Sequence, residues 1–286
     1  MLKIERTDGP FGCVVHGVDI APGLDSQTCR QLHEALYENR VLVLKNQTCD
    51  EAAYLAFGRQ WGAPIPHVLD THRMPGFPEM LEVGNTTARA KDRQSRNNAA
   101  FWHTDQSYDA DPATSTMLYA RIVPDAGGET RIVDTKAAYD DLDESTEKRI
   151  DGLVALHLYG ATAGRDGEEA TLTLTSSQAE EVPPTAHPLV RGHSVTGAKA
   201  LYGIAGTAFG IEGMGREEAE ALIAGLKAHC LRDKYIYSHK YEVGDIAIWD
   251  TQMTLHCATP IDVPDGPGTE RLLWRISVRG KPAVFQ

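Results

Sequence analysis

The chain has 286 residues, of which 42% are hydrophobic and 24% are charged, as is typical of a soluble globular protein with a substantial core. Its formal net charge of −12 argues against general nucleic-acid or anionic-membrane binding, because both need a basic surface. The five cysteines are scattered without a C-x-x-C pair, which argues against a disulfide framework or a zinc ribbon. The N-terminus has no apolar signal region and no apolar run approaches a membrane span, so we expect a cytoplasmic protein.

The N-terminal segment alternates between strand and helix patterns. Residues 2–20 alternate loosely and predict a short antiparallel start. Apolar residues recur at helical spacing over 24–40, and V-L-V-L at 41–44 then predicts a buried strand. Thr48 followed by Glu51 is the pattern of a capping box, which predicts the start of a second helix.

Two long polar segments interrupt the regular patterns. Residues 64–100 are rich in Pro, Gly, Asn, Arg and Asp, and they come just before a candidate metal motif, which favours an active-site lid over a plain surface loop. Residues 160–184 are polar, with a Thr/Ser tract, and predict an exposed insertion. A β-sandwich or barrel of this length forms one unit, so we interpret residues 1–286 as a single domain.

The rest of the chain is mostly predicted strand. The order of the predicted elements is strands, then helices and insertions, then strands again. This order predicts a mainly β fold with flanking helices, a double-stranded β-helix or jelly roll. In such a fold an early strand and a late strand become neighbours in space. The predicted strands lie at 117–123, 130–133, 187–195, 200–205, 235–241, 246–249 and 272–278, and the predicted helices lie at 134–152 and 215–230.

The segment F-W-H-T-D-Q-S-Y at residues 101–108 carries a metal-binding pattern. His103 and Asp105 are two residues apart, so in a strand or at its end both side chains point to the same face. A second histidine would complete the facial triad of non-haem Fe(II) oxygenases, which leaves positions open for co-substrate and O₂. By itself the short H-x-D pattern also fits a strand histidine beside a solvated aspartate.

A late segment supplies candidate partners for this motif. His256 follows the strand predicted at 246–249 and is well placed in chain order as a third metal ligand, with a structural histidine as the alternative. Arg271, Arg275 and Arg279 recur every four residues in an otherwise apolar strand, so they share a face. Arginines there are costly unless they meet an anion, and arginine is suited to bidentate carboxylate recognition. The alternative is three arginines on a solvated face.

These segments together resemble the taurine and chlorophenoxyacetate dioxygenase (TauD/TfdA) family of Fe(II)- and 2-oxoglutarate-dependent oxygenases. The similarity covers nearly the whole chain, and the set of motifs is specific in this order although each motif alone is not. The matching segments are V-L-V-L-K-N-Q, F-G-R-Q-W-G, F-W-H-T-D-Q-S-Y, G-G-E-T, H-P-L-V-R, G-D-I-A-I-W-D with the histidine after it, and R-L-L-W-R.

The resemblance implies an iron site and a co-substrate site. It makes His103, Asp105 and His256 the Fe(II) ligands. It implies that 2-oxoglutarate and O₂ are co-substrates. Thr130, in the G-G-x-T turn, and Arg271 are then the residues that bind the distal carboxylate of 2-oxoglutarate. Because related halogenases carry a small residue in place of the aspartate, the intact Asp105 favours hydroxylation-type chemistry. No catalytic residue beyond the metal site is implied.

The same resemblance places Arg275 and His67 in the substrate site. An arginine there predicts an anionic group on the substrate, such as a carboxylate, sulfonate or phosphonate. Asp70 stands where the taurine enzyme has a tyrosine and could meet a substrate amine. Ala99 stands where that enzyme has an asparagine, with Asn98 one step away. The motifs therefore support the iron and 2-oxoglutarate sites but do not support taurine as the substrate.

The function implied by the resemblance is hydroxylation of a small, anionic molecule with release of succinate and CO₂. The same iron site also supports desaturation, cyclisation or epimerisation, and these alternatives stay open. A non-catalytic metal-binding jelly roll is a different class, which would form no succinate. A zinc hydrolase would need a positioned base, which H-T-D-Q does not supply. The resemblance also implies a homo-oligomer, either a dimer or a tetramer.

Overall fold

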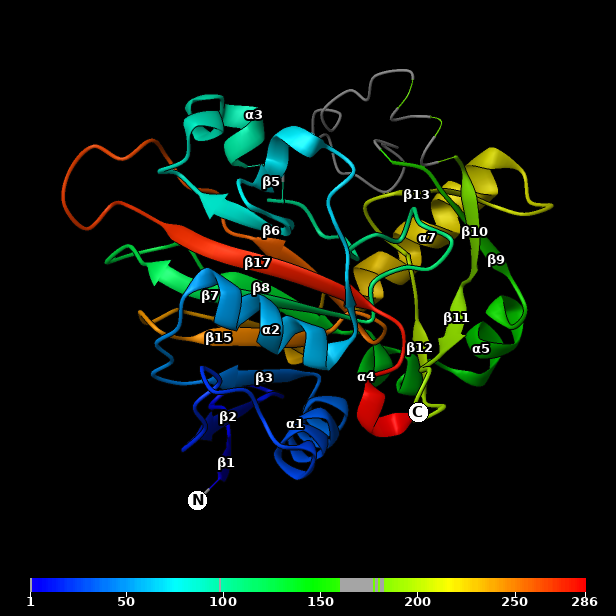
Figure 1. Cartoon of the computed structure of the whole chain (residues 1–286). Helices are drawn as coiled ribbons and strands as arrows, with labels where there is room; N and C mark the ends of the chain where they lie inside the picture. Colours follow the sequence, from blue (N-terminus) through cyan, green and yellow to red (C-terminus); the bar gives the residue numbers. More distant parts are fainter. Residues whose placement is uncertain (1, 98, 160–176, 178–179, 181–182) are drawn as a thin grey trace.

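The computed structural model describes residues 2–97, 99–159, 177, 180 and 183–286 (Figure 1). The insertion predicted at 160–184 therefore lies almost wholly outside the described residues, and so does Asn98. None of the helices in the described part of the chain combines the length and the apolar character that crossing a bilayer requires.

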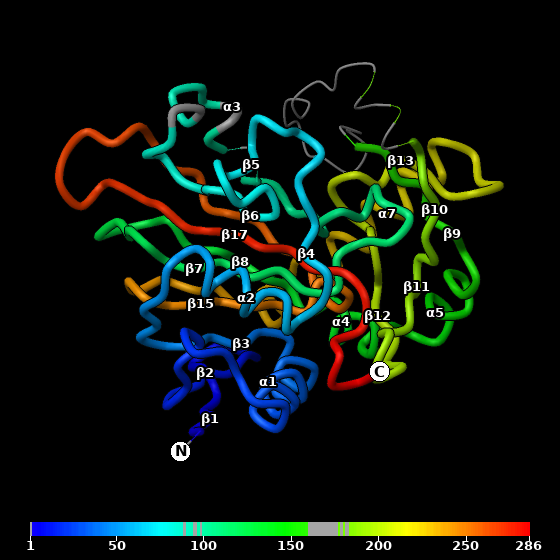
Figure 2. Tube along the Cα trace, in the orientation of Figure 1, coloured from blue at the N-terminus to red at the C-terminus, as the bar shows by residue number. Residues whose placement is uncertain are grey.

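A large sheet mixes strands from distant parts of the chain. The C-terminal β17 (Leu272–Arg279) lies between β7 (Ser115–Ile122) and β6 (Phe77–Gly84), and β15 (Ile246–Asp250) lies between β7 and β3 (Val41–Leu44). Figure 2 shows the red C-terminal trace of β17 beside these earlier segments. The other strands of this sheet are β1 (Lys3–Arg6), β2 (Cys13–His16), β4 (Ala63–Pro64) and β5 (Arg73–Met74).

A three-stranded sheet packs against the large one. Its order is β14 (Ile236–His239), β8 (Thr130–Asp134) and β16 (Thr254–Ala258). Ile132 of β8 and Leu118 of β7 belong to one buried apolar cluster, so the core lies between the two sheets. This arrangement is the mainly β jelly roll with flanking helices that the sequence predicts.

The strand β3 is buried on both faces. Val41 and Val43 belong to the cluster between the sheets, whereas Leu42 and Leu44 pack with residues of two helices on the opposite face. All four side chains are fully buried, which explains why this strand has a continuous apolar sequence and not an alternating one. The two helices are α1 (Ser26–Asn39) and α2 (Glu51–Trp61).

Smaller elements complete the fold beyond the two sheets. The amphipathic helix α7 (Arg216–Cys230) buries the residues that its sequence pattern predicts, among them Leu222 and Ile223. The smaller strands are β9 (Val154–His157), β10 (Thr185–Pro188), β11 (Val190–Gly192), β12 (Lys199–Leu201) and β13 (Ala208–Ile211). The buried side chains of α7 belong to one apolar cluster with residues of β9, β12 and β13. Figure 1 shows α7 beside β13.

Two helix predictions need correction. The helix cap assigned to Thr48 is wrong: Asp50 precedes α2 and accepts a hydrogen bond from the backbone N–H of Ala53, as an N-cap does. The helix predicted over 134–152 is broken into α4 (Thr135–Asp140) and α5 (Glu144–Ile150). Each of the two short helices has its own aspartate cap, and this aspartate favours a new start over a continuous helix.

The stretch 64–100 contains more regular structure than its composition indicates. It holds β6, whose Leu81 lies opposite Arg275 of β17 in an antiparallel register. The alternation of β6 is weak and includes Pro78, so its pairing with a strand from the end of the chain decides its conformation. The stretch also holds the short helices η1 (Asp70–His72), η2 (Ala88–Lys91) and α3 (Arg93–Arg96). Two other short helices, η3 (Asp233–Tyr235) and η4 (Ala283–Phe285), lie later in the chain.

The close approach of β6 and β17 requires a glycine at position 84. A Cβ at this position would lie 2.0 Å from the carbonyl oxygen of Arg271, so the two strands would have to separate. We expect Gly84→Ala to lower the free energy of unfolding by about 1–3 kcal/mol, measured by urea denaturation. In the matched variant Gly210→Ala the new Cβ meets only Leu156 Cδ1 at 3.8 Å. An equal loss of stability in both variants would contradict this account.

Candidate active site

A backbone bridge joins the H-x-D segment to β16. The N–H of His103 donates to the carbonyl of His256 at 3.0 Å, and the N–H of His256 donates to the carbonyl of His103 at 2.9 Å. The two imidazole rings lie with their centroids 4.2 Å apart. His103 forms an isolated β-bridge and Asp105 follows in a turn, so the motif lies at the end of a bridge and not within a longer strand, and the two side chains converge.

The convergence of three side chains creates a possible metal site. His103, Asp105 and His256 offer ligand atoms that all lie within 4.8 Å of one another. The Nε2 atom of His103 is 3.5 Å from Asp105 Oδ1, and the Nε2 atom of His256 is 3.7 Å from Asp105 Oδ2. Two imidazoles and one carboxylate, all buried or half-buried, are the donor set that non-haem Fe(II) oxygenases use.

The Asp105 carboxylate is held in its ionised form. Burial by itself raises the pKa of this carboxyl, but the Arg275 guanidinium and the two imidazoles outweigh burial and hold the pKa well below its usual range. The Nη2 atom of Arg275 lies 2.9 Å from Asp105 Oδ1, and the hydroxyl of Thr116 donates to Oδ2 at 2.7 Å. A carboxylate fixed by these two contacts is a ready metal ligand.

The surroundings of the two histidines also favour metal binding. The Nδ1 atom of His103 lies 2.8 Å from the carbonyl oxygen of Phe101, so a hydrogen bond there leaves Nε2 with the lone pair. Burial, together with the neighbouring His103 ring and the Arg275 guanidinium, holds the pKa of His256 well below its ordinary value. His256 is therefore neutral, which is the form that binds a metal.

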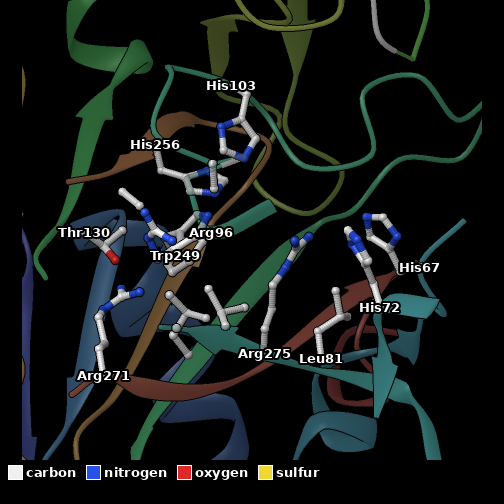
Figure 3. A pocket seen from close by; sticks show the side chains of 15 residues that line it. His67, His72, Leu81, Arg96, His103, Thr130, Trp249, His256, Arg271 and Arg275 are labelled. Atoms are coloured by element: carbon white, nitrogen blue, oxygen red, sulfur yellow. The ribbon is translucent and has the colours of Figure 1, made fainter. Parts of the chain in front are cut away.

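One cavity contains this triad's histidines and the predicted co-substrate residues (Figure 3). Thr130 and Arg271 lie on one side of it, and His67 and His72 lie on the other. Leu81 contributes an apolar side chain to its wall. The further lining residues are Val83, Gly84, Arg96, Ala99, His103, Leu118, Trp249, His256, Ala258 and Arg275.

Arg271 is a buried cation that faces this cavity. Its side chain donates from Nε to the carbonyl of Gly128 at 3.0 Å, and its backbone N–H donates to Asn85 Oδ1 at 2.7 Å. Only 2% of the residue is exposed, and burial lowers its pKa. No aspartate or glutamate among the described residues forms an ion pair with it. A buried guanidinium without a carboxylate partner fits the distal carboxylate of 2-oxoglutarate.

Thr130 completes this end of the cavity. Its hydroxyl is 2.9 Å from the hydroxyl of Tyr241, and only 2% of the residue is exposed. The G-G-E-T turn that leads to it brings Gly128 against Arg271: a Cβ on Gly128 would lie 3.1 Å from Arg271 Cδ. Gly128 has φ = +77°, a conformation that glycine adopts readily. The turn therefore supplies both the threonine and the space for the arginine.

Arg275 and Arg279 lie in β17 and Arg271 lies just before it, and the surroundings of the three arginines differ. Arg271 is buried in the cavity, whereas Arg275 lines the cavity and is engaged by Asp105 and by the Ser277 hydroxyl. Arg279 forms an ion pair with Asp109 at 3.1 Å, and 32% of its side chain is exposed. Arg275 therefore has a structural partner that the sequence pattern did not reveal.

The predicted substrate residues separate into three groups. His67 lines the cavity, with its ring stacked at 5.0 Å on His72, a cavity residue that no motif indicated. Asp70 is exposed, accepts a hydrogen bond from the Thr71 N–H, and does not line this cavity. Asn98 lies outside the described residues.

Another residue that sequence reasoning missed is Arg96. It lies in the segment whose composition indicated only a lid, and it lines the cavity from α3. The concentration of arginines in that segment was a signal that a polar cavity wall could lie there.

The fold and the site together define a class of protein. A jelly roll that places two histidines and a buried arginine around one cavity, with an aspartate beside the histidines, is the arrangement of an Fe(II)- and 2-oxoglutarate-dependent dioxygenase. The chain belongs to the family described as "Taurine catabolism dioxygenase TauD, TfdA family", whose model matches residues 4–277.

Several relatives and solved structures are similar to the chain over most of their length. The alpha-ketoglutarate-dependent 2,4-dichlorophenoxyacetate dioxygenase of Burkholderia sp. (strain RASC) is 31% identical over 87% of this chain and 86% of its own. The (S)-phenoxypropionate/alpha-ketoglutarate-dioxygenase of Sphingobium herbicidovorans is 30% identical over 98% and 96%. The crystal structure of AAD-2 in complex with Mn(II) and N-oxalylglycine has a TM-score of 0.85 at 26% identity, covering 98% of this chain and 99% of that one.

The hydrogen bond from Thr116 to Asp105 generates a prediction. We expect Thr116→Val to weaken Mn(II) binding by about 10- to 100-fold, because the ligand carboxylate loses the hydroxyl that orients it. Calorimetric titration of the metal-free protein with Mn(II) measures the affinity. Thr116→Ser keeps the hydroxyl and is expected to bind Mn(II) within a few-fold of the wild type. If Thr116→Val binds Mn(II) as tightly as Thr116→Ser, the hydroxyl does not orient the ligand.

Proposed function

We propose that this enzyme hydroxylates a small anionic substrate, a carboxylate, sulfonate or phosphonate, with release of succinate and CO₂. His103, Asp105 and His256 hold the Fe(II), and Thr130 and Arg271 hold the distal carboxylate of 2-oxoglutarate. The observation that carries the proposal is the buried Arg271, which lacks a carboxylate partner among the described residues and lines the same cavity as the two histidines.

The residues of the chain supply position and charge. Bound Fe(II) and 2-oxoglutarate supply the oxidising chemistry with O₂. Arg271 and Thr130 set the orientation of 2-oxoglutarate from its distal end, because their own positions are fixed by Gly128 and Tyr241. Asp105 occupies the third ligand position, which supports transfer of oxygen to the substrate over transfer of a halide.

The cavity also supports an anionic substrate with an apolar body. Arg275 and His67 contact the substrate in this proposal, since both line the cavity outside the Thr130–Arg271 end. Leu81 and Leu118 provide an apolar wall. Two relatives are named for 2,4-dichlorophenoxyacetate and (S)-phenoxypropionate, which combine a carboxylate with an aromatic ring.

A binding screen tests the substrate class. The anaerobic Fe(II)–2-oxoglutarate complex is titrated with an anion panel, defined as 2,4-dichlorophenoxyacetate, hexyl sulfate, butanesulfonate and phenylphosphonate. Each anion has an uncharged partner of similar shape, such as the methyl ester, the alcohol or the sulfonamide. We expect at least one anion to shift the visible metal-to-ligand charge-transfer band and, after O₂ is admitted, to yield succinate and a hydroxylated product.

The outcome of this screen separates the competing functions. A product that is desaturated, cyclised or epimerised would show that the site catalyses that reaction and not hydroxylation. Metal binding without succinate formation from any compound would favour a non-catalytic jelly roll. Binding of the uncharged compounds alone would overturn the anionic substrate class.

The two cavity arginines are expected to act on different ligands. Arg271→Ala is expected to raise the KM for 2-oxoglutarate by about 10- to 100-fold, because a charge-assisted hydrogen bond is lost. Arg275→Ala is expected to raise the KM for the anionic substrate instead, and the assay needs saturating Fe(II) because Arg275 also contacts Asp105. Arg279→Ala, on the same face of β17 but paired with Asp109, is expected to change neither KM. An unchanged KM for the anion in Arg275→Ala would refute this assignment.

A further inference from the structure

Three guanidinium groups line the cavity, and two of them have assigned partners. Arg275 contacts Asp105 Oδ1 at 2.9 Å and also donates to the Ser277 hydroxyl from Nε and Nη2, at 3.2 and 3.0 Å. Arg271 is the proposed partner of 2-oxoglutarate. The third guanidinium belongs to Arg96, which is half-buried and forms no ion pair with an aspartate or glutamate in the described part of the chain.

The Arg96 side chain is held in place by backbone carbonyls. Its Nε donates to the carbonyl of Ile261 at 2.9 Å, and its Nη1 donates to the carbonyl of Ala90 at 2.6 Å. These acceptors are neutral and do not compensate the positive charge of Arg96. The remaining terminal nitrogen, Nη2, makes no hydrogen bond to the residues that the structure describes.

The segment that carries Arg96 is itself attached to the connection after β16. The side chain of Asn97 exchanges two hydrogen bonds with the backbone of Ile261, at 2.9 and 3.2 Å. The N–H of Ala258 donates to the carbonyl of Ala99 at 2.8 Å. Arg96 is therefore presented to the cavity by a fixed backbone, and little side-chain entropy is lost when it binds a ligand.

The charges in the cavity indicate which ligand Arg96 meets. Both carboxylates of 2-oxoglutarate have partners in the proposed function, one at the metal and one at Arg271 and Thr130. Asp105 pairs with Arg275 and would also hold the metal. Arg96, Arg271 and Arg275 line the same cavity, and in the view of Figure 3 Arg96 is drawn between the other two arginines. Arg96 is thus the cation that remains for the substrate.

We propose that Arg96 is a specificity-determining residue that binds the anionic group of the substrate and makes the enzyme select anions over uncharged molecules of the same shape. This inference rests on the proposed function and extends it, because it assigns the excess positive charge of the cavity to a residue of the 64–100 segment. The anionic group lies between Arg96 and Arg275, and the uncompensated charge of Arg96 supplies most of the selectivity.

The test compares Arg96→Gln with Arg93→Gln. Arg93 lies in the same short helix and has the same charge, but it is exposed and does not line the cavity. Each loaded Fe(II)–2-oxoglutarate protein is titrated anaerobically with the anion panel and its uncharged partners. For Arg96→Gln we expect anion binding to weaken by about 10- to 100-fold, with binding of the uncharged partners and the KM for 2-oxoglutarate within a few-fold of the wild type. Arg93→Gln is expected to match the wild type throughout.

Other outcomes overturn the inference in distinguishable ways. If Arg96→Gln weakens charged and uncharged compounds equally, Arg96 only supports the segment through Ala90 and Ile261. If it raises the KM for 2-oxoglutarate and leaves anion binding unchanged, its ligand is the co-substrate. Either result leaves the proposed function intact. If the wild type binds only the uncharged compounds, the anionic substrate class fails first, and the role of Arg96 fails with it.

Discussion

The pair of backbone hydrogen bonds between His103 and His256 is the contact on which the site depends. It joins two segments that are far apart in the chain and sets both imidazoles beside Asp105. A metal ligand on a loop loses conformational freedom when it binds, and a main-chain bridge removes much of that freedom beforehand. Thr116 and Phe101 then orient the carboxylate and one imidazole through single hydrogen bonds.

The strand β17 has a comparable part in the co-substrate site. It lies between β7 and β6, and Arg271 stands just before its first residue. The close approach at Gly84, the hydrogen bond that the Arg271 N–H donates to Asn85 Oδ1 and the carbonyl of Gly128 together confine this arginine. Burying a cation without an anion lowers the stability of the folded protein. A protein that keeps such a buried arginine is consistent with a binding function for it.

Charge distribution gives the cavity its chemical character, in contrast to the protein as a whole. The chain has a formal net charge of −12, yet three guanidinium groups line one cavity. They are held differently. Arg275 is held by the Asp105 carboxylate and Arg96 by backbone carbonyls, whereas Arg271 is buried without a carboxylate partner among the described residues. A locally positive, partly apolar cavity in an acidic protein fits the small anionic substrate that we propose.

Much of the fold and the site could be predicted from the sequence because the signals are local. The helix over 24–40, the buried strand at 41–44 and the H-x-D spacing depend on neighbouring residues, and the structure confirms the two elements almost to the residue. The jelly roll followed from the order of the predicted strands and helices, and the family followed from the order of the motifs. The conformation of β6 could not be read locally, because it depends on pairing with β17.

The sequence by itself therefore determined the residue types of the chemistry: two histidines, an aspartate, a threonine and the arginines at and just before β17. Only the tertiary structure decided which of the arginines keeps its charge available. Arg275 is bound by Asp105, Arg279 by Asp109, and Arg96 enters the cavity from a segment with no recognisable pattern. Whether a charge is compensated depends on which atoms lie within a few ångströms, and those atoms come from distant parts of the chain.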